Sequence, residues 1–91
     1  MTARNAERIL LRQTLQLVLK SGRGMIVRTL NVSRSGMSVQ SMLPVKIGST
    51  VRVRAKTVAL LNGAAVVRHC ERRGLAYKIG LEFHVPLYDR F

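Results

Sequence analysis

Apolar and polar side chains alternate at every second position in several short stretches of this 91-residue chain. The apolar members of the clearest stretches are Leu15, Leu17 and Leu19, then Val51 and Val53, then Ile79, Leu81 and Phe83. A period of two places these side chains on one face of an extended strand, which is the pattern of a half-buried β-strand. Polar, glycine-containing turns separate the stretches, so the sequence predicts an all-β fold.

The alternation and the turns together predict six strands. We expect strands over residues 14–20, 25–32, 37–41, 50–55, 57–70 and 75–84, with turns at 21–24, 33–36 and 72–74. The stretch 57–70 has two interpretations: a hairpin turning at Asn62-Gly63, or one long strand with a glycine bulge. Its two-residue phase favours the single bulged strand. Six short strands joined by tight turns indicate a small antiparallel barrel.

The first dozen residues lack this alternation. Thr2 would cap a helix running through Glu7 and Leu10, but a short isolated helix is marginal without packing. We therefore expect a flexible N-terminal arm over residues 1–13, followed by a barrel domain over residues 14–91.

Charge and size both favour a small binding module. The formal net charge is +12, from 16 Lys and Arg against 4 Asp and Glu. A single core of this size buries about two-thirds of the unfolded surface, which leaves little area for a deep catalytic cleft. Arg outnumbers Lys twelve to four, and guanidinium groups bind phosphate and guanine bidentately. On charge alone, nucleic acid, anionic lipid and nucleotide all remain candidate partners.

The side chains that support catalysis or metal binding are sparse. His69 and His84 lie 15 residues apart with only Cys70 and Glu82 nearby, so we expect neither a metal site nor a catalytic residue, and no cofactor. A single cysteine indicates a reducing compartment, and no apolar run approaches the roughly 20 residues of a membrane span. These features predict a soluble, cytoplasmic, non-enzymatic protein.

Two short motifs separated by 22 residues point to a ligand. Arg4-x-x-x-Arg8 offers two guanidinium groups on the arm, and Asn31-x-Ser33-x-x-Gly36 places an amide, a hydroxyl and a glycine at a predicted turn. This combination suits a ligand with phosphates and purine edges, because guanidinium binds both bidentately and the turn supplies short polar contacts.

The arginine motif is common in this Arg-rich chain. The same spacing occurs at Arg8/Arg12 and at Arg68/Arg72, and such patterns carry a high false-positive risk. The order and separation of the two motifs therefore carry more information than either motif alone.

This order of features resembles the PilZ domain, the bacterial receptor module for cyclic di-GMP. Arg4 and Arg8, followed by residues 9–12 and the first strand, lie where the family carries Arg-x-x-x-Arg, and residues 31–36 fit its Asp/Asn-x-Ser-x-x-Gly signature. The segments that look like its middle and last strands are Gly48–Val51, Ala65–Arg68 and Ile79–Phe83.

The resemblance implies a six-stranded split barrel that holds cyclic di-GMP, as a monomer or an intercalated dimer, with the arm folding over the ligand and signalling to a partner protein. Its ligand-binding residues would be Arg4, Arg8, Asn31, Ser33 and Gly36. Arg12 and Arg34 are secondary candidates, and Arg8/Arg12 is a competing register for the arginine motif. Because the chain stops at Phe91, we expect little or no C-terminal helix.

Other interpretations of these residues remain open. The arginines of the arm are also explained as solvated charge, and the second motif as a serine turn with a purely structural role. A basic barrel that binds single-stranded nucleic acid is an alternative function, which is disfavoured because only four aromatic residues are available for base stacking. A PilZ-like adaptor that binds no ligand is another alternative.

Overall fold

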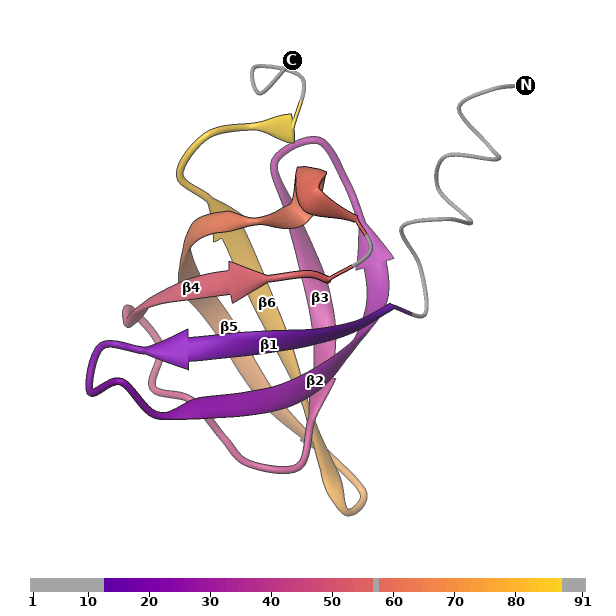
Figure 1. The fold of residues 1–91 in the computed structure, drawn as a ribbon. Helices are drawn as coiled ribbons and strands as arrows, with labels where there is room; N and C mark the ends of the chain where they lie inside the picture. The colour runs from indigo at the N-terminus through magenta and orange to yellow at the C-terminus, as the bar shows by residue number, and fades with distance from the viewer. Residues whose placement is uncertain (1–12, 57, 88–91) are drawn as a thin grey trace.

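The alternating stretches form six strands that close into one antiparallel barrel (Figure 1). The computed structural model describes residues 13–56 and 58–87. The strands are β1 (Thr14–Leu19), β2 (Gly24–Val32), β3 (Gly36–Ser41), β4 (Thr50–Arg54), β5 (Gly63–Arg73) and β6 (Ala76–Phe83). Their order around the barrel is β1-β2-β3-β6-β5-β4, and β4 pairs with β1 to close it. The predicted all-β, six-stranded antiparallel barrel is therefore confirmed.

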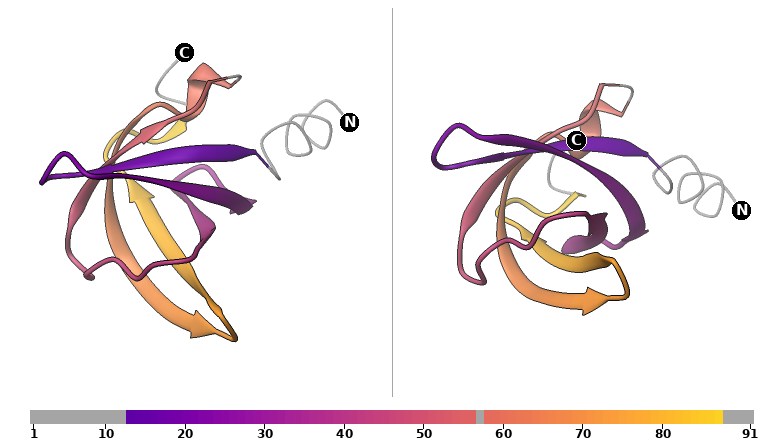
Figure 2. Two further views of the ribbon diagram at one scale, coloured as in Figure 1. Left: turned by 60° about the horizontal axis from the view of Figure 1, so that its bottom comes forward. Right: turned by 90° about the horizontal axis from the view of Figure 1, so that it is seen from below.

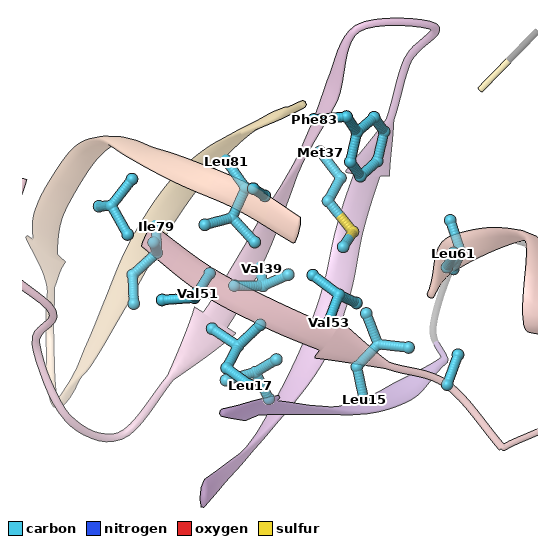
Figure 3. Packing of buried hydrophobic residues seen from close by; sticks show 14 of the residues in the cluster. Leu15, Leu17, Met37, Val39, Val51, Val53, Leu61, Ile79, Leu81 and Phe83 are labelled. Atoms are coloured by element: carbon cyan, nitrogen blue, oxygen red, sulfur yellow. The ribbon is translucent and has the colours of Figure 1, made fainter. Parts of the chain in front are cut away.

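The interior of the barrel is filled by aliphatic side chains from the alternating positions. Leu15, Leu17, Val53 and Ile79 are each at most 1% exposed, and Figure 3 shows side chains from β1, β3, β4 and β6 pointing toward one another. Full burial of one such side chain contributes roughly 1.5–3 kcal/mol. The core therefore fixes which face of every strand points outward.

The connection from β4 to β5 corrects the sequence-based prediction. Residues 57–70 are not one bulged strand, and Asn62-Gly63 is not a hairpin turn: a short 3-10 helix, η1 (Ala59–Leu61), precedes β5. Leu61 is fully buried, and the Ala55 N–H donates to Asn62 Oδ1 at 2.6 Å. Burial of Leu61 and this side-chain bond together shape the connection, which a two-residue periodicity cannot predict.

The β5–β6 hairpin also turns later than predicted. Arg72 and Arg73 pair with Tyr77 and Ala76, so the turn comprises only Gly74 and Leu75. Figure 2 shows this hairpin projecting from the barrel.

Two β-bulges change which side chains face outward. In β2, Val27 and Thr29 are buried, but the register shifts between Thr29 and Asn31, so Asn31 faces outward opposite Ser38. In β5, a second shift between Val67 and His69 leaves Arg68 as the extra residue. Both bulges lie on the same side of the barrel, and bulges commonly re-aim side chains beside functional sites.

Candidate functional site

Four outward-facing residues form a row across strands β2, β3, β6 and β5. The ladders pair Asn31 with Ser38, Ser38 with Gly80, and Gly80 with His69. With neighbouring strands about 4.8 Å apart, the row spans about 14 Å. Its two middle residues are small, so the row has a low floor between an amide at one end and an imidazole at the other.

The row lies in an open depression of about 300 Å³. The polar residues and glycines that line it are Asn31, Ser33, Ser35, Gly36, Ser38, Arg68, His69, Gly80 and Glu82. Asn31, Ser33 and Gly36 were predicted from the sequence as ligand-binding residues, and the structure brings all three to this depression. Met37 and Leu81 also line the depression. This open hollow therefore combines polar groups with apolar surface, which suits a planar ligand with polar edges.

The turn from β2 to β3 forms one wall of the depression and is closed by Ser33. The Ser33 N–H donates to the Gly36 carbonyl oxygen at 2.8 Å, and Ser33 Oγ donates to the same oxygen at 3.1 Å. The Gly36 N–H donates in turn to Ser33 Oγ at 3.3 Å. A hydroxyl has one donor and two acceptor positions, so Ser33 closes this turn and keeps one acceptor position for a ligand.

Gly36 is required by packing and not by an unusual backbone conformation. Its φ is not among the positive values, which occur at Gly22, Gly48, Gly63 and Gly74. A Cβ at Gly36 would instead collide with the carbonyl oxygen of Leu81 on β6. The turn therefore approaches β6 closely because this residue has no side chain.

His69 lies against the backbone of Gly80. A Cβ at Gly80 would lie 3.2 Å from His69 Cδ2 and 3.3 Å from His69 Cβ, which is tighter than ordinary van der Waals contact. Gly80 thus leaves room for the imidazole at the end of the row.

Arg68 and Glu82 form an exposed ion pair at the rim of the depression. Arg68 Nε lies 2.6 Å from Glu82 Oε1, and the side chains are 57% and 51% exposed. Solvent screening limits exposed pairs to about 0–1 kcal/mol. An anionic ligand would therefore displace Glu82 from the Arg68 guanidinium at little cost.

Gln13, the last residue of the predicted arm, bonds to β2 beside this depression. Gln13 N–H donates to Thr29 Oγ1 at 2.7 Å, and Thr29 N–H donates to the Gln13 carbonyl oxygen at 2.9 Å. Thr29 is two residues before Asn31 in β2. At about 3.5 Å per extended residue, Arg8 is at most about 18 Å of chain from Gln13, and Arg4 at most about 32 Å.

The remaining predicted residues stand apart from this group. Arg34 is exposed in the β2–β3 turn and does not line the depression. Arg4, Arg8 and Arg12, and with them the arm up to residue 12, lie outside the described residues, as does the chain after residue 87. Sequence reasoning missed Ser38, Arg68, His69 and Gly80. The sequence contains one signal for these residues: the two consecutive polar residues Arg68 and His69 interrupt the alternation of apolar and polar side chains within β5.

Within residues 13–56 and 58–87, no group of three or more His, Cys, Asp or Glu is placed to hold a metal ion. In the same part of the chain, no helix has the length and apolarity needed to cross a membrane.

Comparison with known proteins identifies one match. The family model of the PilZ domain matches residues 2–90, which is nearly the whole chain. No curated protein and no solved structure matches the chain.

Proposed function

This chain belongs to the PilZ domain family, and on that premise we propose that it is a non-enzymatic receptor for the bacterial second messenger cyclic di-GMP. The observation that carries the proposal is the depression that unites Asn31, Ser33 and Gly36 with the polar row across four strands. The same family premise supports a bacterial, cytoplasmic location.

The chemistry of the depression suits a guanine base. Guanine presents O6 and N7 acceptors and an N2 amino donor. The Asn31 amide both donates and accepts, and Ser33 Oγ keeps one acceptor position. The low floor at Ser38 and Gly80 lets a planar ring lie against the sheet, beside the imidazole of His69.

The arginines supply the charge that two phosphates require. We assign Arg4 and Arg8 to the phosphates and to the O6/N7 edge of guanine, since guanidinium binds both bidentately. Arg68 adds a cation at the rim, and Arg12 and Arg34 are secondary candidates. Ordering the arm costs roughly 1–2 kcal/mol per residue. Charge-assisted hydrogen bonds of roughly 1.5–3 kcal/mol each offset this cost for a few residues.

An arm that orders over the ligand provides the signal. The free and bound states then differ in the surface beside Gln13, and a downstream protein that distinguishes the two surfaces reads the ligand concentration. The chemistry of the receptor itself is limited to binding.

Calorimetric titration with cyclic di-GMP tests these assignments. Arg8→Ala and Ser33→Ala should each weaken binding at least tenfold, which is about 1.4 kcal/mol. Arg72→Ala is the matched control, because Arg72 lies at the far end of β5 and outside the depression. A thermal melt of each variant separates loss of the Ser33 turn from loss of a ligand contact.

The same titration resolves the register of the arginine motif. If Arg4/Arg8 is correct, Arg4→Ala loses affinity as Arg8→Ala does, and Arg12→Ala changes it little. The opposite result assigns the site to Arg8/Arg12. Unchanged affinity in both Arg8→Ala and Ser33→Ala contradicts the site as a whole.

A further inference from the structure

A second hollow lies outside this site, where the start of β1 faces the end of β4 (Figure 1). Its volume is about 1000 Å³. We define it as the β1–β4 groove by six of the residues that line it: Thr14, Gln16, Ile26, Arg52, Arg54 and Lys56. None of the six lines the depression described above.

The groove exists because barrel closure is incomplete at this end. The ladder between β1 and β4 runs from Gln16↔Arg54 to Leu19↔Val51, so Thr14 lies beyond its end. Ala55, the residue after β4, donates its N–H to Asn62 Oδ1 at 2.6 Å. After Arg54 the chain leads into η1 instead of continuing the ladder, and the first residues of β1 have no β4 residue in register with them.

Thr14 presents a strand edge to the groove. Alternate residues of an antiparallel strand direct their N–H and C=O groups to opposite neighbours. The N–H and C=O of Gln13 both bond to Thr29 on β2. The backbone groups of Thr14 are consequently directed toward β4, beyond the last pair of that ladder, where an added strand would find a donor and an acceptor.

The other wall of the groove is cationic. Arg52 and Arg54 alternate along β4, Lys56 follows with the same spacing, and all three are exposed. The ion pairs of the described residues, Arg68–Glu82 and Arg73–Glu71, are confined to β5 and β6. Among the lining residues that the structure describes, none is acidic and none is aromatic. Ile26, 65% exposed across β1, adds an apolar contact.

We propose that the β1–β4 groove binds an extended acidic segment of a partner protein by addition of a strand to the edge at Thr14. Carboxylates at every second residue of such a segment share the period of the cations along β4. This inference does not depend on cyclic di-GMP.

Other occupants fit the groove less well. The arm itself, residues 1–13, carries three Arg and one Glu, so its positive charge opposes entry. A single-stranded nucleic acid gains much of its affinity from stacking on aromatic side chains, and the described lining offers none. An acidic polypeptide satisfies both the charges and the strand edge.

Fluorescence anisotropy with a labelled ten-residue peptide of alternating Glu and Val tests the proposal on the full chain at low ionic strength. Arg52→Glu/Arg54→Glu should weaken peptide binding at least tenfold. Lys46→Glu/Arg72→Glu is the matched control, since it lowers the net charge equally outside the groove, and it should change affinity less than threefold. The amide of Thr14 should exchange more slowly with solvent when the peptide is bound.

Three results overturn the proposal. Equal losses in the two double variants mean that only net charge attracts the peptide. Tighter binding of a ten-nucleotide oligothymidine, lost in the same groove variant, means that the groove binds nucleic acid. Failure of the peptide to bind the wild-type chain, or binding that leaves exchange at Thr14 unchanged, contradicts strand addition.

Discussion

At the scale of single residues, the candidate site depends on side chains that are small or missing. Gly36 lets the β2–β3 turn approach β6, and Gly80 leaves room for the His69 ring. Ser33 then closes the turn through its backbone and its hydroxyl. The same residues thus shape the depression and line it.

Gly36→Ala should destabilise the barrel by roughly 1–3 kcal/mol, because the new Cβ meets the backbone oxygen of Leu81 and the strand must shift. Gly24→Ala is the matched control, since a Cβ there meets only the flexible end of the Gln16 side chain. Urea denaturation of both variants measures the difference. Equal stability of the two variants would contradict the close approach of the turn to β6.

At the scale of the strand, the two bulges decide which residues reach the site. A strict period of two through the buried Val27 and Thr29 would place Asn31 inside the barrel, and the extra residue Leu30 turns it outward. The extra residue Arg68 does the same for His69 in β5. The row therefore ends in outward-facing polar side chains on both sides.

The fold was largely predictable from the sequence, and the bulges explain much of what was not. Alternation in Leu15 and Leu17, or in Ile79 and Leu81, reports burial on one face and so identifies strands directly. A bulge is set by pairing with another strand, so the sequence of β5 alone cannot locate it. The 3-10 helix was missed for a similar reason, because burial of Leu61 depends on the closed barrel.

The residues that line the candidate site were predictable in part. The sequence motif identified Asn31, Ser33 and Gly36 because they are local to one turn. Ser38, His69 and Gly80 join them only through strand pairing between β3, β5 and β6.

Deletion of single residues in β5 tests the role of its bulge. Removing Arg68 should leave a folded barrel, because Val67 still faces inward and His69 outward in a regular ladder. Removing Val66 should abolish cooperative unfolding, because Val67 then faces outward and the next inward position falls to Arg68. Thermal melts followed by circular dichroism compare the two. A folded Val66 deletion, or an equally disrupted Arg68 deletion, contradicts the observed register.

At the scale of the whole molecule, the depression and the β1–β4 groove occupy different parts of the barrel surface, and Gln13 lies close to both. The depression lies over β2, β3, β6 and β5, and the groove lies between β1 and β4. Gln13 lines the groove and also bonds to Thr29, close to Asn31. Gln13 thus contacts the proposed partner surface and, through Thr29, lies near the proposed ligand surface, which gives the proposed signal a short path.

Binding of cyclic di-GMP to the purified chain is the central claim of this account. Isothermal titration calorimetry should show saturable heat with cyclic di-GMP and none with guanosine monophosphate at the same concentration, because only the cyclic dinucleotide offers two phosphates and two guanines to the arm and the depression together. Absence of saturable heat with cyclic di-GMP, in a preparation shown to be folded by its thermal melt, would contradict the account.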